Sequence, residues 1–282
     1  MRVFVAVDME GITGIVHPDQ LLPDGRGYQQ AQQLLVGDVN AVVDGILDVH
    51  PDAEIIIGDG HATMRNIDLQ QLRPSVELVV GPGTIVNKPL CQLEGIQYGA
   101  DVAFCVGYHS KAGTVGGLLS HTFVGSLIAD LRLNGKSIGE VEANAAVLSA
   151  KNIPLALVSG SSDLVTEVRA WSPSLTVVST KTTLGPTAAI CKTPAVTASM
   201  LRSAASAAVR NTQSWHLRDV GAATFEVTTK QNDQLERAIS LPRVERVSDD
   251  AFAVYGDDAE IAFRGLWSAC IAALGEVPQW LR

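Results

Sequence analysis

The N-terminal two thirds of the chain alternate between short apolar runs and longer segments in which apolar residues recur at helical spacing. The helical pattern occurs in residues 28–49, in residues 139–151, and between the apolar run at 155–158 and about residue 170. Short continuous apolar runs of this kind are typical of buried strands, which we predict at residues 3–7, 54–58, 76–80, 102–106 and 155–158. Strands that alternate with helices predict an α/β fold, with a mostly parallel sheet and helices on both faces.

The pattern changes after Pro194. Ala-rich and apolar helical patterns cover residues 197–211 and 257–274, and residues 222–228 alternate as an exposed edge strand would. We therefore expect a smaller C-terminal α+β lobe in residues 191–282, after a larger α/β domain in residues 1–190. No Ser/Gly-rich linker marks residue 190, so this boundary rests on the change of pattern alone.

Two local patterns lie inside the larger domain. Residues 84–99 have a helical pattern, although Pro89 limits its first turn. Residues 126–133 read as a strand, and the Asn134-Gly135 pair that follows favours a type I′ turn. We therefore predict a helix in the first segment and a β-hairpin in the second.

Composition narrows the class of protein. The 282 residues are 46% hydrophobic and 18% charged, which is enough to form a large buried core. The net charge of −9 disfavours nucleic acid as a partner, because a phosphate backbone requires a basic face. No stretch approaches the roughly 20 apolar residues that span a bilayer, and the run after Arg2 is too short for a signal peptide. We therefore expect a cytoplasmic protein without a membrane partner.

The cysteines restrict the kinds of metal site that the chain can form. The four cysteines are scattered without a CxxC spacing, which argues against a disulfide framework or a thiolate zinc site; they are Cys91, Cys105, Cys191 and Cys270. Any metal would therefore be held by histidines and carboxylates.

Chemically active side chains follow three of the predicted strands. Asp8 and Glu10 come after the first strand, His61 after the second and His109 after the fourth, with His121 further on. The carboxyl ends of parallel strands meet at one edge of a sheet, where ligands bind. Residues two apart in an extended chain point to the same side, so Asp8 and Glu10 can face one target. Their burial would cost several kcal/mol unless a cation or another partner offsets it.

Each of these residues has an ordinary structural explanation when it is taken alone. Asp8 could cap a helix or form a turn, Asp59 before Gly60 could form a turn, and each histidine could be structural. Their occurrence together at one sheet edge favours a metal site instead. Imidazole and carboxylate ligands suit Zn²⁺, and also Mn²⁺, Fe²⁺ or Co²⁺, and a carboxylate can bridge two metal ions.

A further carboxylate is needed to complete two metal sites. Glu140 and Glu142 lie two residues apart in a predicted helix, so they do not share a face and at most one of them is a ligand. An acidic residue at the start of a helix is also favoured by the helix dipole, which is the structural alternative for both.

Five motifs in order resemble the zinc-dependent D-aminopeptidases of the DppA type, peptidase family M55. The motifs cover about residues 3–160, and the region around Lys181 with the segment CKTP resembles the family more loosely; they are VDMEG, GDGH, GYH, SH and GEVEANA. The resemblance implies two zinc ions per subunit, with His121 as the catalytic residue and Asp8 bridging the metals. The metal ligands that it implies are Asp8, Glu10, His61, His109 and Glu140.

The same resemblance implies a substrate class and an assembly. It implies an aminopeptidase that removes N-terminal D-residues of the D-Ala type from short peptides, and a ring-shaped homo-oligomer, a decamer. Three alternatives stay open at this point. The first is another two-metal hydrolase such as a phosphoesterase, and the second is a non-catalytic D-dipeptide-binding protein. A doubly wound domain without any metal is the third.

Supporting roles can be suggested for a few further residues. Asp59 could hold the second nitrogen of an imidazole ligand, Asn144 belongs to the last motif, and Glu142 is a spare acid for proton transfer. Lys111 and Lys181 could bind a peptide carboxylate or stabilise an oxyanion, although solvated surface lysines are the simpler interpretation.

Overall fold

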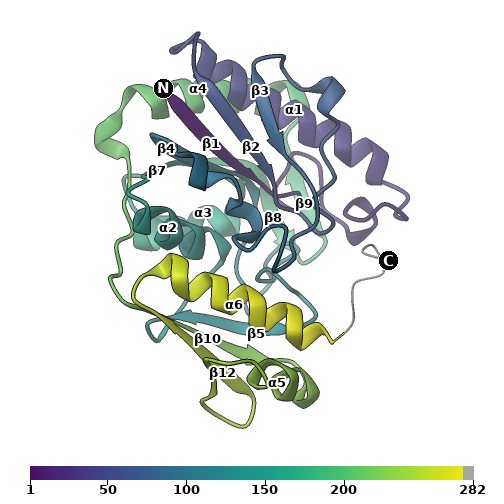
Figure 1. Ribbon diagram of the computed structural model, residues 1–282. Coiled ribbons are helices and arrows are strands. Elements are labelled where there is room, and N and C mark those ends of the chain that lie inside the picture. Colours follow the sequence, from purple (N-terminus) through teal and green to yellow (C-terminus); the bar gives the residue numbers. More distant parts are fainter. Residues whose placement is uncertain (276–282) are drawn as a thin grey trace.

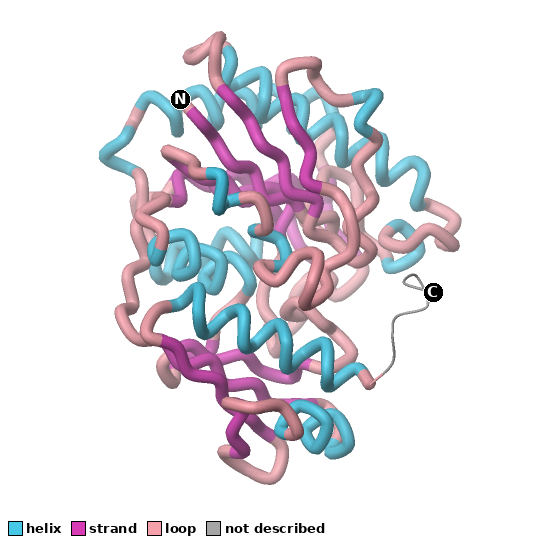
Figure 2. The backbone as a smooth tube through the Cα atoms, viewed as in Figure 1, coloured by secondary structure: helices cyan, strands magenta, loops and turns pink. Residues whose placement is uncertain are grey.

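The computed structural model describes residues 1–275, and residues 276–282, which end the predicted C-terminal lobe, lie outside the described part. It contains two sheets with helices packed on and between them (Figures 1 and 2). The first sheet has the order β3-β2-β1-β4-β7-β8-β9, and all its strands are parallel except β9. Its strands are β1 (Arg2–Val7), β2 (Glu54–Asp59), β3 (Val76–Val79), β4 (Val102–Tyr108), β7 (Leu155–Ser161), β8 (Thr176–Gly185) and β9 (Ala188–Cys191). This arrangement confirms the predicted fold class.

Helices cover both faces of this sheet, and the alternation within β1 shows why. Val3, Val5 and Val7 pack into the core formed with α1 (Tyr28–Leu47) and α4 (Pro194–Arg210). Phe4 and Ala6 point to the opposite face, where the core includes α2 (Glu140–Ala150) and α3 (Ser162–Trp171). Successive side chains of a strand point to opposite faces, so a continuous apolar run is needed to fill both cores.

The second sheet is antiparallel and has the order β11-β12-β10-β5-β6. Helix α6 packs on this sheet beside α5, and its other side contacts α2, so it lies between the two sheets (Figure 1). The elements are β5 (Ile128–Leu133), β6 (Lys136–Ser137), β10 (Ala223–Thr229), α5 (Asn232–Ile239), β11 (Val244–Arg246), β12 (Ala251–Gly256) and α6 (Ala259–Leu274). The predicted hairpin is confirmed, because Asn134 and Gly135 both have positive φ in the turn between β5 and β6.

Two local predictions are wrong. Residues 84–99 do not form one helix but turns with two short 3-10 helices, Cys91–Leu93 and Ile96–Tyr98. Pro89 and the positive φ of Gly95 and Gly99 interrupt the helical pattern there. The segment predicted as an edge strand became β10, which lies in the middle of its sheet, because alternation also arises when one face is covered and the other is half exposed.

The division of the chain at residue 190 stays a prediction. The second sheet takes β5 and β6 from before this residue and β10, β11 and β12 from after it. Helix α4, which follows residue 190, packs against α1 on the first sheet. No helix in residues 1–275 combines the length and apolar character that crossing a bilayer requires.

The connections around β1 create the crevice that positions the site. Strand β1 pairs with β2 on one side and with β4 on the other. The chain builds the sheet outward from β1 through β2 to β3, and then continues on the other side of β1 with β4, β7 and β8. Ligands of open α/β sheets bind at such a switch point, beyond the carboxyl ends of the strands. The loop after β1 packs tightly against β4, because a Cβ on Gly11 would lie 1.9 Å from the carbonyl oxygen of Tyr108. Only glycine fits there.

Candidate metal centre

Asp8 lies at the centre of a cluster of carboxylates and imidazoles. Its Oδ1 is 3.2 Å from Nδ1 of His61, and its Oδ2 is 3.3 Å from Nε2 of His109. The three residues come from the ends of β1, β2 and β4, the three neighbouring strands at the switch point. Each carboxylate oxygen of Asp8 therefore faces a different histidine, which is the arrangement that a bridging carboxylate requires.

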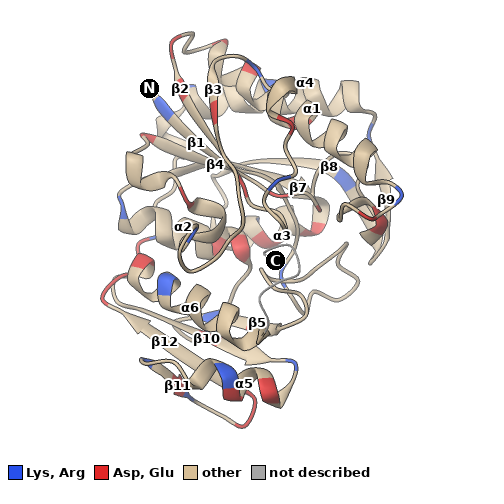
Figure 3. Cartoon of the chain, turned by 45° about the vertical axis from the view of Figure 1, so that its right-hand side comes forward, with Lys and Arg blue, Asp and Glu red and all other residues tan. Residues whose placement is uncertain are grey.

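Two more carboxylates complete one group of three on each side of Asp8. Oε2 of Glu10 is 3.1 Å from Nδ1 of His61, and Oε1 of Glu140 is 3.4 Å from Nε2 of His109. One possible ligand atom from each residue lies within 4.8 Å of the others in both groups, Asp8-Glu10-His61 and Asp8-His109-Glu140. Figure 3 shows acidic segments in red between the ends of the central strands and α2.

His121 lies at the open side of this cluster. Its Nε2 is 3.9 Å from Oε1 of Glu10 and 4.0 Å from Oε1 of Glu140, and its ring stacks on His109 with the centroids 4.1 Å apart. The side chain is 26% exposed, whereas the other five side chains of the cluster are 8% exposed or less. His121 is thus the most exposed member of the cluster.

Backbone carbonyls hold the second nitrogen of all three imidazoles. His61 Nε2 lies 2.9 Å from the oxygen of Leu21, and the Nδ1 atoms of His109 and His121 lie 2.9 Å from the oxygens of Ser110 and Leu119. A carbonyl only accepts, so each of these nitrogens carries the hydrogen and the opposite nitrogen is free to bind a cation. The suggestion that Asp59 fills this role is therefore wrong.

The pKa values of the cluster are shifted in the direction that favours bound positive charge. Burial lowers the pKa of His61 and His109, but the carboxylates outweigh it, chiefly Glu10 for His61 and Glu140 for His109. The pKa of each imidazole therefore lies well above its usual value. Burial raises the pKa of Glu10, yet the neighbouring histidines hold it below its usual range. Bound protons or bound metal cations can supply this charge, and metals compete with protons for such ligands.

The polar atoms that have no hydrogen-bond partner fit a metal centre. Within the described residues, Asp8 Oδ2, Glu10 Oε2 and His109 Nε2 are buried without a hydrogen-bond partner. Buried polar atoms normally form hydrogen bonds, so three buried ligand atoms that face other ligand atoms of the cluster without forming one mark a site for another species. Carboxylate oxygens and imidazole nitrogens are ligands that zinc accepts.

Asp59 and Asn144 support the cluster from behind. Asp59 accepts hydrogen bonds from the backbone N–H and the side chain of Asn66, and Asn66 in turn donates to the carbonyl oxygen of His61. Asn144 donates to Oε1 of Gln92 at 2.8 Å. Both residues therefore fix the neighbours of possible ligands and do not contribute ligand atoms themselves.

Gln92 is the main site residue that the sequence did not reveal. Its Nε2 donates to Oε2 of Glu140 at 2.5 Å, while its Oε1 accepts from Asn144 and from the hydroxyl of Tyr108. The backbone N–H of Phe123 donates to the other oxygen of Glu140 at 2.6 Å. A glutamine beside a cysteine in a segment with a helical pattern carries no signal for this role.

The remaining three predicted residues lie outside the cluster. Glu142 forms ion pairs with Lys136 and Arg218, so it is not the spare acid of the site. Lys111 donates to Ser137. Lys181 is fully buried, and its ammonium group donates to carbonyl oxygens of the loop after β1.

The fold and the cluster define an α/β protein with a candidate two-metal centre at the switch point of its larger sheet. The chain belongs to peptidase family M55, the D-aminopeptidases, whose family model matches residues 1–268. This membership confirms the resemblance that the five motifs suggested.

Two relatives agree with the family assignment. A D-aminopeptidase of Bacillus subtilis (strain 168) is 27% identical over 213 residues, which cover 75% of this chain and 74% of the relative. A solved structure is similar with a TM-score of 0.90 and 22% identity, and the match covers 97% of this chain and 98% of the other. That structure is described as the Zn-dependent D-aminopeptidase DppA from Bacillus subtilis, a self-compartmentalizing protease. At 22% identity, the similarity to this structure supports the fold of the chain.

Proposed function

We propose that this chain removes N-terminal D-amino acids from short peptides or amides, with two zinc ions held by Asp8, Glu10, His61, His109 and Glu140. The observation that carries the proposal is the position of Asp8, whose two oxygens face the histidines of two separate ligand groups. Membership of the D-aminopeptidase family and the names of both Bacillus relatives support the substrate class and the metal.

The residues divide the chemical work between holding and proton transfer. When bound, the zinc ions supply Lewis acidity and lower the pKa of water toward neutrality. Asp8 fixes the spacing of the two ligand groups, and the carbonyl partners keep the imidazoles in the tautomer that binds metal. His121, whose Nε2 faces the open side, transfers a proton to the leaving amine.

We propose that the chain assembles into a closed ring-shaped homo-oligomer, a decamer, in the cytoplasm. The support is the similar fold of the Bacillus subtilis structure, which is described as a self-compartmentalizing protease. The free cysteines Cys91, Cys105, Cys191 and Cys270 fit a reducing compartment. Sedimentation velocity tests the assembly, and a monomer at micromolar concentration would contradict it.

Metal analysis and paired substrates test the activity together. The purified protein is expected to contain about two zinc ions per chain and to hydrolyse D-Ala-p-nitroanilide faster than the L-isomer. A chelator should abolish this activity and added zinc should restore it. Activity that is indifferent to chelator would contradict the proposal. Hydrolysis of phosphate esters without amide cleavage would favour the phosphoesterase, and binding of D-dipeptides without turnover would favour the binding protein.

A further inference from the structure

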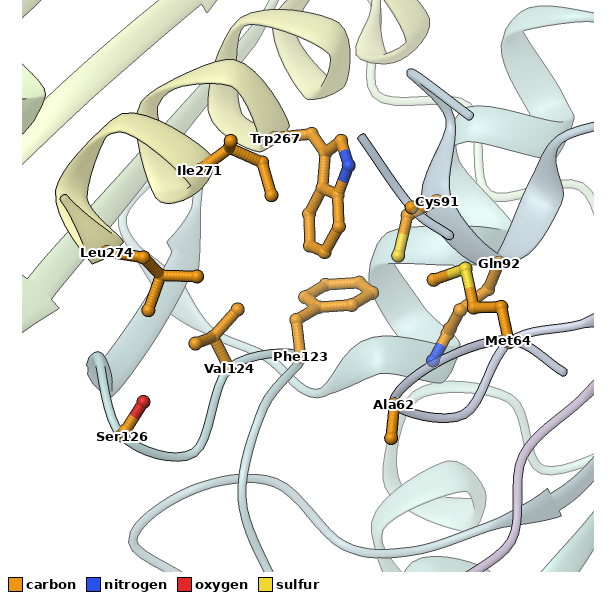
Figure 4. A pocket seen from close by; sticks show the side chains of 12 residues that line it. Ala62, Met64, Cys91, Gln92, Phe123, Val124, Ser126, Trp267, Ile271 and Leu274 are labelled. Carbon is orange, nitrogen blue, oxygen red and sulfur yellow. The ribbon is translucent and has the colours of Figure 1, made fainter. Parts of the chain in front are cut away.

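A cavity of about 350 Å³ lies beside the metal centre. Figure 4 shows the side chains that line it. It lies between α6 on one side and the loops that follow β2, β3 and β4 on the other. Its walls are mostly apolar, and the side chains that converge on it include Met64, Phe123, Val124, Trp267, Ile271 and Leu274. An apolar cavity of this size at a catalytic centre is the usual form of a binding pocket for part of a ligand.

The cavity and the metal centre share residues. Gln92 lines the cavity and donates to one oxygen of Glu140, while Phe123 lines it and donates its backbone N–H to the other oxygen. Gly60 and Ala62, the neighbours of His61 in the chain, also line it. A group that occupies the cavity therefore lies one residue away from two of the candidate metal ligands.

The backbone around the cavity is strained. Four residues that line it have positive φ although they are not glycine: Ala62 at 44°, Met64 at 53°, Cys91 at 53° and Phe123 at 48°. Such conformations cost of the order of 1 to 3 kcal/mol each, and they cluster at binding and catalytic sites. Strain concentrated around one cavity indicates that its shape is built for an occupant.

The space of the cavity depends on small and rigid groups. Phe123 packs edge to face against Trp267 and Phe263, with ring centroids 6.4 Å and 5.4 Å apart, which gives the wall a fixed shape. Gly83 lines the cavity as well, and a Cβ there would lie 2.6 Å from Cε of Met64 and 3.1 Å from Trp267. Glycine at position 83 thus leaves Met64 and Trp267 in place, and the cavity of about 350 Å³ that they help to line is larger than a methyl group requires.

We propose that this cavity binds an apolar side chain larger than methyl, carried by a peptide residue next to the scissile bond. The proposal rests on the proposed function, because it assigns a side-chain preference to the same peptidase site. The side chain can belong to the N-terminal residue or to the residue after it, because both can present the same apolar group to the cavity. Separate substrate series distinguish these two positions. Each added methylene in such a pocket changes kcat/KM by roughly tenfold or more.

Steady-state kinetics with two substrate series test the cavity. The first compares D-Leu-p-nitroanilide with D-Ala-p-nitroanilide, and the second compares D-Ala-D-Leu with D-Ala-D-Ala. In one series the wild-type protein should prefer the leucine substrate by about tenfold or more. Ile271→Trp, which fills the cavity, should lower this ratio at least tenfold. Ile261→Trp, the same change at an exposed position of α6, should leave it unchanged.

Binding without turnover separates this proposal from the proposed function. Calorimetry with the zinc-loaded protein that carries His121→Ala compares D-Leu-D-Leu with D-Ala-D-Ala. We expect about tenfold tighter binding of D-Leu-D-Leu, which Ile271→Trp removes and Ile261→Trp keeps. Equal or undetectable binding of both dipeptides, together with equal kcat/KM in both series, would overturn the cavity proposal. If the dipeptides differ in binding as expected but the wild-type protein hydrolyses no substrate of either series, the result would support the cavity proposal and contradict the peptidase function.

Discussion

The Nζ atom of Lys181 lies 2.6 Å from the carbonyl oxygen of Glu10, although 171 residues separate them in the sequence. The same ammonium group donates to the carbonyl oxygens of Ile12 and Ile15. Lys181 belongs to β8 and its side chain is fully buried, and burial lowers its pKa to about 8. This one side chain therefore closes the loop that presents Asp8 and Glu10.

Replacing Lys181 should destabilise the protein strongly. Lys181→Met leaves three carbonyl oxygens of this loop without their donor, and we expect the free energy of unfolding to fall by about 3 kcal/mol. Urea denaturation monitored by circular dichroism measures the change. Lys192→Met is the control, because this partly exposed lysine donates to a single carbonyl oxygen. Equal losses in both variants would contradict the bracing role of Lys181.

Gln92 should control how firmly the site holds metal. Gln92→Leu removes the donor that orients Glu140, and loss of such a partner typically weakens metal affinity by about 10- to 100-fold. Competition with a chromogenic zinc chelator measures the dissociation constant. Gln97→Leu is the control on the same segment, because Gln97 bonds only to Glu94 and Gly95. Unchanged zinc affinity in Gln92→Leu would contradict the role of Gln92 in orienting Glu140.

Replacing His121 and replacing His109 should have different effects on zinc content and turnover. His121→Ala should keep its zinc and lose turnover by about 10²- to 10⁴-fold, as expected for a residue that transfers a proton. His109→Ala should lose zinc as well as turnover, since Nε2 of His109 faces both Asp8 and Glu140. Zinc analysis and D-Ala-p-nitroanilide hydrolysis on the same preparations separate the two. Loss of zinc from His121→Ala would make this residue a ligand.

Asp38 gives the stability a defined dependence on pH. Burial raises its pKa to about 6, although the N–H and hydroxyl of Thr13 donate to its carboxylate. The folded protein therefore binds a proton on Asp38 that the unfolded chain has released, and this stabilisation is complete near pH 4 and lost as the pH rises through 6. Asp38→Asn has no ionisable group at this position and does not lose stability in this way. The free energy of unfolding of the variant, minus that of wild type, should therefore rise by up to about 3 kcal/mol between pH 4 and 7.

Denaturation at several pH values measures this difference, and Asp44→Asn on the same helix is the control. The hydrogen bond from Arg73 lowers the pKa of Asp44, so its stabilisation is present at neutral pH and lost on acidification. The difference between Asp44→Asn and wild type should therefore stay nearly constant between pH 4 and 7, and change with the opposite sign only below about pH 4. A difference for Asp38→Asn that does not vary with pH would contradict the buried ionisation.

The sequence could predict the strand ends of the site because local patterns encode them. Asp8, His61 and His109 each follow an apolar run, and the rule that parallel strands end at one edge brings them together without any knowledge of contacts. Glu140 could be chosen over Glu142 only through the family resemblance. The structure gives the physical reason, because Glu142 faces Arg218 on the other side of α2.

Other parts of the site depend on contacts between distant segments. Gln92 lies in a segment whose helical pattern was misleading, and its role exists only because Glu140 is placed beside it. Lys181 looked like a surface lysine, since no local pattern indicates that its ammonium group meets the loop after β1. The cavity has the same origin, because α6 and the loops after β2 and β4 lie far apart in the chain.

The loop that carries His121 runs from β4 in the first sheet to β5 in the second. During synthesis on the ribosome, β4 can join β1 and β2 as soon as residue 108 has emerged. Strand β5 gains its partner β10 only after residue 229 has followed. The hairpin of β5 and β6 can form earlier, after residue 137, so the segment with His121 and Phe123 connects the first strands of the first sheet to a second sheet that is completed later in synthesis.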